Sequence, residues 1–554
     1  MRFFTPSLFS LLFIASGSLS AAPVVLHNIQ GYGFDDKGNI AQFSHFAFDN
    51  QSGKVLARGD KSAVAAYSKA EQIDGKGQTL LPGLIDGHGH VLGLGQNLNQ
   101  VDLRTCSSEA QAVAQVAAFA KAHPQSQWIL GRGWNQVLWP TQQFPGKTLL
   151  DESIQDKPVW LTRVDGHAGW ANSKALQLAG ITKETIDPPG GEIIRDAEGN
   201  PTGVLIDNAM LLLEKQIPQQ SEAERLAALD AAFEHLLALG ITSTHDAGVD
   251  QANLQSYQQL RKDNKLPLRI YAMLSATDPN LADWLKAGPM LDKDDIFVAR
   301  SVKIYGDGAL GSRGAALIEP YSDQPGQKGL FVTQPDKLTA LMKLTLDAGF
   351  QTNVHAIGDL TNRLVLDRFE QLASKEQLEQ GRHRIEHAQI VSPKDIPRFA
   401  QLHILPAMQP THATSDKNMA ADRLGIARLR GAYAWKTFVD QGSRIVAGSD
   451  YPVELANPFY GIHAAVTRQD QQNQPVGGWL PQQRLSLTQA LKSFTVDAAY
   501  GAFQDHSMGS LAPGMWADFI LVDRDIFKVA PETLWQTKVQ QTWVAGQQKY
   551  QASM

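Results

Sequence analysis

The middle of the chain repeats one arrangement of apolar and polar positions. In each repeat an amphipathic helix ends near a glycine, a short β-branched run follows, and a His or Asp closes that run. The clearest helices span 221–239, 337–348 and 432–439, and the runs that follow span 241–246, 350–355 and 444–450. Strands that alternate with helices predict a parallel sheet. This many units favour a closed (β/α)8 barrel over an open doubly wound sheet.

Both ends of the chain show short runs typical of antiparallel strands instead. These runs span 24–27, 41–48, 54–57, 517–522, 538–544 and 547–550, and an Ala545-Gly546 turn joins the last two. Neither end has enough strands for a stable sheet, so we expect the two ends to meet in one small β-sandwich. Residues 22–80 and 505–554 would then form the composite sandwich and residues 81–504 the barrel.

A stretch rich in Trp, Pro and Gly interrupts the repeat at about 102–208. It is expected to be an insertion between the early barrel strands. Long insertions of this kind often carry substrate contacts.

The N-terminus has the pattern of a secretory signal peptide over residues 1–21. Met1-Arg2 precedes an apolar stretch over 3–20, and small residues follow at Ala21-Ala22. The alternative is an uncleaved membrane anchor, but the stretch contains several hydroxyl side chains and is short against the ~20 apolar residues of a span. We therefore expect a secreted or periplasmic protein that has no membrane contact after cleavage.

Composition narrows the choice of partner. The chain has 554 residues, 43% of them hydrophobic and 19% charged, with a formal net charge of −6 and no long run of one sign. This balance argues against nucleic acid or an anionic membrane surface and favours a small-molecule substrate. The single cysteine, Cys106, excludes an intrachain disulfide and a cysteine-built metal site. The composition is also compatible with a homodimer.

The strongest chemical signal is the pair His88-Gly89-His90, which follows the apolar run that starts at Leu80. Residues two apart in a strand project to the same face, so the spacing aims two imidazoles at one point where the strand stops. This is the start of a metal site.

Other residues of ligand type close later strands. Lys303 lies inside an apolar run, and His355, His387 and Asp450 each lie at a likely strand end. A lone histidine at a strand end is more often a hydrogen-bonded core residue than a ligand. Four histidines and an aspartate in successive barrel strands indicate a metal centre instead, because the carboxyl ends of barrel strands carry the chemistry.

Long segments of the chain resemble the amidohydrolase superfamily, and within it the amidohydrolase-3 or YtcJ-like branch. The matching segments cover most of the chain: PGLIDGHGH at 82–90, DGHAGWANSKAL at 165–176, VKIYGDGALGSRGAAL at 302–317, VHAIGD at 354–359, RIEHAQ at 384–389, GSDYPV at 448–453 and LAPGMWADFILVD at 511–523.

The resemblance implies a metal centre in which His88, His90 and Asp450 bind one ion and His355 and His387 bind a second. Lys303 would bridge the two as a carboxylated lysine. A lysine ammonium, with a pKa near ~10.4, only donates hydrogen bonds, so it ligates a metal after CO2 converts it to a carbamate. We expect zinc, although manganese, iron, cobalt or nickel would fit. Two ions are favoured over one because the ligands outnumber the positions of a tetrahedral zinc.

The same resemblance assigns Asp450 the role of general base and then general acid. Zinc lowers the pKa of water to about 7, which makes hydroxide available at neutral pH. We therefore expect an exported metal-dependent hydrolase of a non-peptide C–N bond in a small linear or cyclic amide, for example an N-substituted formamide. One alternative is a deaminase of the same fold that attacks an amidine carbon. The other is a non-catalytic metal-binding regulatory protein.

Further polar residues are weaker candidates. His167 and Trp170 of the insertion are expected to contact substrate, as are Asp307 and Arg313 in the loop after Lys303. A structural salt bridge is an equal interpretation of Arg313. Three residues near predicted strand ends match no ligand position, and these are His245, Asp246 and His412. Trp134 and Trp139 are expected to pack the insertion.

Overall fold

The computed structural model describes residues 23–218 and 220–553, so the signal peptide expected at 1–21 lies outside the described residues. The centre of the protein is an eight-stranded parallel sheet in the order β21-β20-β19-β18-β17-β16-β15-β8. A parallel bridge between Gly89 and Tyr451 brings the two edge strands together, so the barrel is nearly closed. The strands are β8 (Leu84–Gly89), β15 (Ile241–Val249), β16 (Arg269–Ser275), β17 (Phe297–Tyr305), β18 (Gln351–Ala356), β19 (Arg384–His387), β20 (Leu405–Met408) and β21 (Val446–Ala447).

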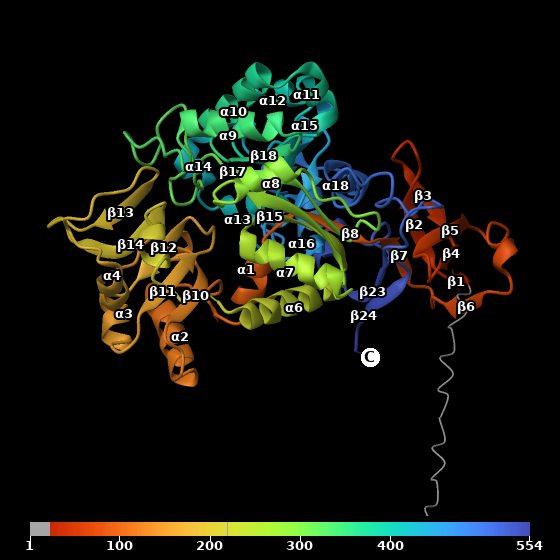
Figure 1. Ribbon diagram of the computed structural model, residues 1–554, viewed down its shortest axis with the longest axis horizontal. Coiled ribbons are helices and arrows are strands. Elements are labelled where there is room, and N and C mark those ends of the chain that lie inside the picture. The colour runs from red at the N-terminus through yellow and green to blue at the C-terminus, as the bar shows by residue number, and fades with distance from the viewer. Residues whose placement is uncertain (1–22, 219, 554) are drawn as a thin grey trace, which may run out of the picture.

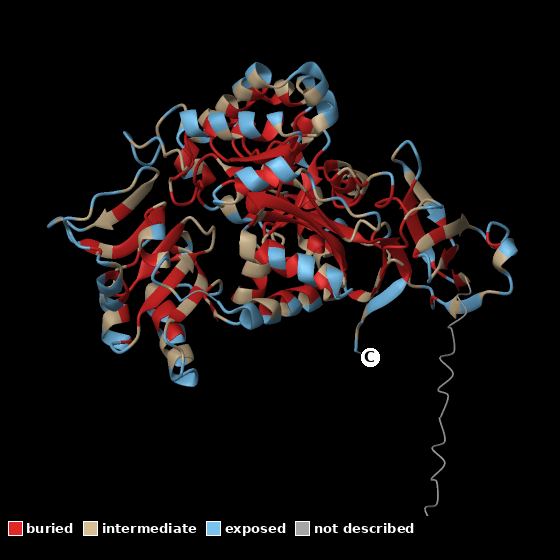
Figure 2. Ribbon diagram, viewed as in Figure 1, coloured by how far each residue is buried: buried red, intermediate tan, exposed pale blue. Residues whose placement is uncertain are grey.

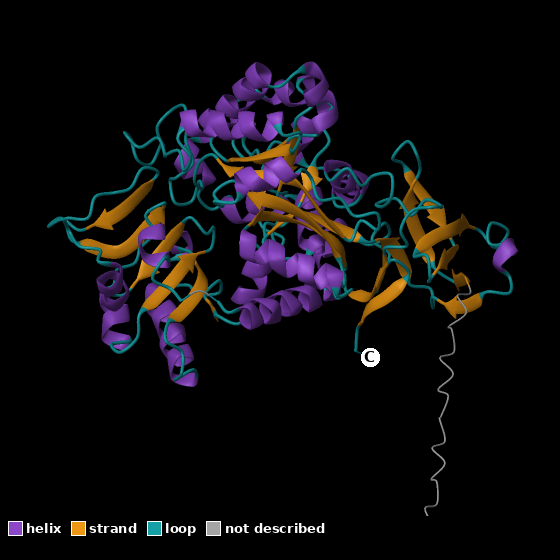
Figure 3. Ribbon diagram, viewed as in Figure 1, coloured by secondary structure: helices purple, strands orange, loops and turns teal. Residues whose placement is uncertain are grey.

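Helices surround this sheet (Figures 1 and 3). Those that follow the barrel strands or connect them are α1 (Val91–Asn97), α6 (Glu222–Ala238), α7 (Gln251–Lys262), α8 (Leu281–Ala287), α9 (Pro335–Asp347), α10 (Asp359–Leu372), α11 (Lys375–Gly381), α12 (Ile396–Gln401), α13 (Pro410–Asp416), α14 (Ala420–Leu424), α15 (Trp435–Asp440), α16 (Pro458–Thr467), α17 (Leu487–Ser493) and α18 (Val496–Gly501). The barrel strands are buried on both faces, and the surrounding helices are exposed on the side away from them (Figure 2). This explains why the strands read as continuous apolar runs.

The predicted barrel is confirmed, and two of the three clearest units have nearly the expected bounds. A capping box at Ser221 and Glu224 starts α6 one residue inside the expected range, and β15 follows after Gly240. The third unit is shorter than expected. Tyr433 has a positive φ of 51°, which delays the start of α15, and the following strand β21 has only two residues.

The two chain ends form two facing sheets, as expected. One has the order β5-β4-β1-β6, and the other mixes strands of both ends in the order β24-β23-β22-β7-β2-β3. Their bounds are β1 (Pro23–His27), β2 (Gln30–Phe34), β3 (Ile40–Phe43), β4 (His45–Asp49), β5 (Lys54–Gly59), β6 (Glu71–Asp74), β7 (Thr79–Pro82), β22 (Phe519–Val522), β23 (Val539–Val544) and β24 (Gln547–Gln551).

Local details of the sandwich differ from the sequence interpretation. The run 41–48, expected as one strand, breaks at Ser44 into β3 and β4, which belong to different sheets. The Ala545-Gly546 turn is confirmed, and its two residues have positive φ values of 48° and 67°, as a tight two-residue hairpin requires.

The insertion between β8 and β15 forms a mixed sheet of its own in the order β13-β14-β12-β11-β10-β9 (Figure 1). Its elements are β9 (Val101–Asp102), α2 (Glu109–Ala122), β10 (Ile129–Trp134), α3 (Thr148–Ser153), β11 (Val159–Arg163), β12 (Ala168–Ala171), α4 (Ser173–Ala179), β13 (Gly191–Arg195), β14 (Pro201–Asp207) and α5 (Leu211–Glu214). Trp134 and Trp139 pack in its core, as expected, with ring centroids 6.2 Å apart. Across residues 23–218 and 220–553, no helix combines the length and the apolar character needed to cross a membrane.

The sandwich core supplies a stability test. Phe519 of β22 is fully buried, and its ring lies 5.2 Å from that of Phe46 and 5.4 Å from that of Phe48 on the facing sheet. Phe519→Ala should lower the free energy of unfolding by about 3–5 kcal/mol, because it leaves a cavity between the two sheets. Urea denaturation followed by circular dichroism measures this. The exposed Leu291→Ala is the control, and equal stability of the two variants would contradict a shared core.

Candidate metal centre

The barrel brings all six expected ligands to the carboxyl end of its strands. His88 belongs to β8, Lys303 to β17, His355 to β18 and His387 to β19, while His90 directly follows β8 and Asp450 lies three residues after the end of β21. Parallel strands end at the same edge, so residues from 88 to 450 of the sequence meet there.

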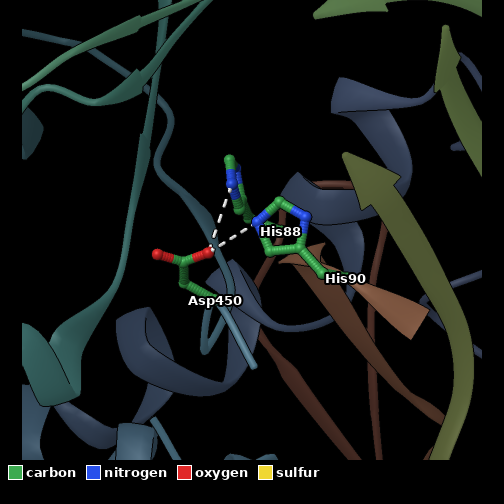
Figure 4. A group of neighbouring side chains, drawn as sticks. All are labelled: His88, His90 and Asp450. Carbon is green, nitrogen blue, oxygen red and sulfur yellow. Dashed lines mark ion pairs between the residues drawn. The ribbon is translucent and has the colours of Figure 1, made fainter. Parts of the chain in front are cut away.

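Asp450 lies between the two imidazoles of the first pair (Figure 4). Its Oδ1 is 3.1 Å from Nε2 of His90 and 3.6 Å from Nε2 of His88. Lys303 reaches the same imidazole, with Nζ 3.1 Å from Nε2 of His88. Apart from His90, which is half-buried, these side chains are almost completely buried.

The second pair lies against the first. The ring centroids of His355 and His387 are 4.5 Å apart, and those of His88 and His387 are 4.9 Å apart. The structure therefore gathers the two expected groups of ligands into one cluster.

The Nδ1 atoms of three of these imidazoles have fixed partners. His88 Nδ1 contacts the carboxylate of Glu386, His90 Nδ1 lies 2.8 Å from the carbonyl oxygen of Ala247, and His387 Nδ1 lies 2.9 Å from Oε1 of Gln409. A ring that donates from Nδ1 keeps the lone pair of Nε2 free for a metal. These contacts orient the rings as ligands.

Sequence reasoning missed Glu386, which precedes His387 in β19. It is fully buried and is held by Arg384, whose Nε lies 2.7 Å from Oε1 and whose Nη2 donates to Oε2 at 2.9 Å. The sequence signal was the pair of opposite charges, Arg384 and Glu386, two residues apart in a short expected strand.

A second carboxylate connects the first and last barrel strands. Asp86 of β8 accepts hydrogen bonds from the backbone N–H of His88 and of Ser449, both at 3.1 Å, and from the Ser449 hydroxyl at 2.7 Å. Burial raises the pKa of Asp86 to about 7. The contact fixes Asp450, the residue after Ser449, beside His88.

The electrostatics of the cluster favour the ligand forms of its residues. Burial holds the pKa of His88, His355 and His387 well below the ordinary value, so these imidazoles are neutral. Burial alone would raise the pKa of Asp450, but the neighbouring imidazoles outweigh it and keep the carboxylate ionised. Metal binding needs neutral imidazoles and an ionised carboxylate.

Two buried atoms support the fit of a divalent cation. Nε2 of His355 and Oδ1 of Asp450 have no hydrogen-bond partner among the residues that the structure describes. Buried polar atoms are rarely left without a partner, so an unpaired nitrogen and an unpaired oxygen in one cluster are explained by a cation that both would bind. The residues present therefore fit a metal ion.

His412 is the second residue that sequence reasoning missed. One nitrogen of His412, one of His387 and one oxygen of Asp450 lie within 4.8 Å of one another. His412 lies in the first turn of α13, just after β20, and it was left without a role because its position near a strand end matched no known ligand position.

The cluster opens into a cavity of about 250 Å³. Its wall combines barrel and insertion residues, among them Arg163, Asp165, His167, His355, His387, His412, Asp416, Asp450 and Glu454. His167, an expected substrate contact, lies on this wall and pairs through Nδ1 with Asp207 at 2.6 Å. Burial disfavours the charged imidazole, but the Asp207 carboxylate outweighs it and raises the pKa of His167.

The structure does not bring the other three expected substrate contacts to the cavity wall. Trp170 is fully buried in the insertion core, where Nε1 donates to the carbonyl oxygen of Gly146 at 3.0 Å. Asp307 is fully buried and accepts hydrogen bonds from three backbone N–H groups, those of Ala316, Ile357 and Gly358. Arg313 forms the structural salt bridge, with Nη2 3.0 Å from Oδ2 of Asp323.

A parallel (β/α)8 barrel with histidines, a lysine and an aspartate at its strand ends is the architecture of a metal-dependent hydrolase. The model of the amidohydrolase family matches residues 71–550, and the chain belongs to this family. It is thus a metal-dependent hydrolase of C–N bonds, and its substrate is a small molecule.

Curated relatives match over most of their length. The chain is 34% identical to Protein LONG AFTER FAR-RED 3 of Arabidopsis thaliana, with 90% of this chain and 87% of that protein covered. It is 33% identical to the putative amidohydrolase YtcJ of Bacillus subtilis, with 88% and 91% covered. It is 26% identical to the N-substituted formamide deformylase of Arthrobacter pascens, with 90% and 94% covered. The expected YtcJ-like resemblance is confirmed.

A solved structure agrees with the fold. The uncharacterized metal-dependent hydrolase from Pyrococcus horikoshii OT3 is 27% identical and superposes with a TM-score of 0.74, covering 92% of this chain and 99% of that one.

Removal of one imidazole tests the centre. His88→Ala should lower the metal bound per chain, because Nε2 of His88 faces both Lys303 and Asp450. Elemental analysis of the purified protein measures the loss. His403→Ala, which changes an exposed histidine, should keep the metal of the wild type. Equal metal content in the two variants would remove His88 from the centre.

Proposed function

We propose that this protein hydrolyses a non-peptide C–N bond in a small linear or cyclic amide, for example an N-substituted formamide. One observation carries the proposal: Asp450 turns Oδ1 toward the His88 and His90 imidazoles, while Oδ2 lies 3.7 Å from Nε2 of His412, on the cavity side. A carboxylate that faces both the ligands and the cavity suits a residue that transfers a proton during hydrolysis. The relative described as an N-substituted formamide deformylase supports this substrate class.

We assign the ligands as the resemblance implied. His88, His90 and Asp450 would hold one ion and His355 and His387 a second, Lys303 would be a ligand after carboxylation, and zinc is the expected metal. Burial lowers the pKa of Lys303 to about 8. A lower pKa leaves more of the neutral amine, which is the form that reacts with CO2.

When bound, zinc lowers the pKa of water and polarises a carbonyl oxygen. Asp450 takes the proton of the attacking water and delivers it to the nitrogen that leaves, so that the amide C–N bond breaks and an amine and a carboxylic acid form. His167, oriented by Asp207, donates a hydrogen bond to the substrate from the insertion side of the cavity.

The cavity sets a limit on substrate size. About 250 Å³ lies below the roughly 300–1,000 Å³ of typical pockets for drug-sized ligands. A small amide fits this volume, and a long peptide does not.

We further propose that residues 1–21 direct export and are then removed, so that the enzyme acts in the periplasm or outside the cell.

The function is tested by elemental analysis combined with a hydrolysis screen over formamides, acylated amines, cyclic amides, amidines and esters. We expect a metal-containing protein that releases amine from a small amide. Release of ammonia from an amidine, with every amide intact, would establish the deaminase alternative. No metal and no turnover after addition of zinc, manganese or nickel would contradict both the amidase proposal and the deaminase alternative.

Asp450→Asn separates proton transfer from metal binding. Asparagine keeps an oxygen near the imidazoles but cannot accept the proton, so kcat should fall about 10²–10⁴-fold while much of the metal remains. Steady-state kinetics on the best amide of the screen, with metal analysis of the same sample, measures both. Asp347→Asn, at an exposed carboxylate, is the control. Unchanged turnover in Asp450→Asn would remove Asp450 from this role.

A further inference from the structure

A hydrogen-bond donor near the carbonyl oxygen of the substrate would add to the polarisation that the metal supplies. When hydroxide attacks an amide carbon, the electrons of the C=O bond move to oxygen, and hydrolytic sites stabilise that oxygen with a preorganised hydrogen-bond donor. The donor has to lie on the cavity wall close to the residue that transfers the proton. The imidazoles of the wall are the first groups to consider.

Four histidines line the cavity: His167, His355, His387 and His412. His167 is engaged by Asp207, and His387 is oriented as a ligand by Gln409. Among the described residues, Nε2 of His355 and Nε2 of His412 are buried without a hydrogen-bond partner. Because His355 already belongs to the second pair of ligands, His412 is the imidazole that remains.

His412 is rigidly placed beside the reaction centre. It is only 8% exposed, and its ring lies nearly parallel to that of His387, at 13° with 5.9 Å between centroids. The residue stands in the first turn of α13, directly after β20, and this junction also carries Gln409, which orients His387. The segment that joins β20 to α13 thus positions both Gln409, which orients His387, and His412, whose Nε2 has no partner among the described residues.

The surroundings of His412 are acidic. Nε2 lies 3.7 Å from Oδ2 of Asp450. Burial raises the pKa of Asp416 and of Glu454, and the nearby His412 opposes the rise in both. Neighbouring carboxylates favour an imidazole that carries N–H donors.

We propose that Nε2–H of His412 donates a hydrogen bond to the carbonyl oxygen of the amide as that oxygen becomes negative. His412 is then a catalytic residue, and it is distinct from the six residues assigned to the metal. The hydrogen bond strengthens as the C=O bond becomes single, while the proton stays on His412 and Asp450 transfers the proton of the attacking water. The inference rests on the proposed function, because it places the carbonyl oxygen of that substrate.

Two substitutions at this position test the donor. His412→Leu removes it with little change of volume, whereas His412→Gln keeps an amide N–H near the position of Nε2. We expect His412→Leu to lower kcat about 10²–10³-fold with KM nearly unchanged, as loss of one oxyanion donor does elsewhere. His412→Gln should recover part of this loss. Steady-state kinetics on the best amide of the screen measures kcat and KM separately. His403→Leu, at an exposed histidine, is the control.

Metal content distinguishes a donor from a ligand. Elemental analysis should find the same number of ions per chain in wild type, His412→Leu and His412→Gln. A loss of one ion in His412→Leu would make His412 a ligand together with His387 and Asp450, which would overturn the proposal. A rise in KM with kcat unchanged would overturn it as well.

A binding measurement keeps the test independent of turnover. Methylphosphonate resembles a tetrahedral oxyanion, and isothermal titration calorimetry measures its affinity. His412→Leu should bind it at least about tenfold more weakly than wild type, with His412→Gln between the two. Equal affinity in all three proteins, or no binding to wild type, would overturn the role of His412. If wild type hydrolyses no amide, the proposed function fails, and the phosphonate comparison still decides the role of His412.

Discussion

The candidate metal centre depends on a series of buried ion pairs and hydrogen bonds beneath it. His88 contacts Glu386, Glu386 is held by Arg384, and Arg384 also reaches Nδ1 of His245 at 2.9 Å and the carbonyl oxygen of Gly87 at 2.6 Å. A buried charge is costly unless it is fully paired, so the position of each group constrains the others. These contacts fix β8, β15 and β19 against one another. They thereby also fix the direction of the His88 ring.

Above these buried ion pairs, the charged and neutral groups of the site separate into two regions. Neutral imidazoles and the ionised Asp450 face the metal position, while Asp416, Glu454 and His412 line the cavity. Asp450 belongs to both regions because its two oxygens face different neighbours. Asp86 holds the preceding residue, Ser449, so this division follows from the closure of the barrel and does not require a flexible loop.

The sequence predicted the fold because the alternation of strands and helices follows from local rules, whereas the proposed ligand set came from the resemblance to the amidohydrolase superfamily. Most of the proposed ligands lie at or near the end of a barrel strand, and parallel strands bring such ends together wherever they lie in the sequence. His412 and Glu386 were missed because their roles depend on contacts across the barrel. Trp170 was assigned to the substrate from its segment, but it lies three residues beyond His167 along an extended chain, and residues an odd number apart project to opposite faces.

The architecture separates chemistry from specificity. The proposed ligands come from the strand-end region that the barrel holds rigidly, whereas the facing wall comes from the insertion, where Asp207 at the end of β14 orients His167. Substitutions in the insertion can therefore reshape the cavity without moving a ligand. His412 lies between the two regions, on a helix that begins just after β20, so in the proposed reaction it would act on the part of the amide common to all substrates. The variable part of the substrate would then extend toward Arg163, Asp165 and His167.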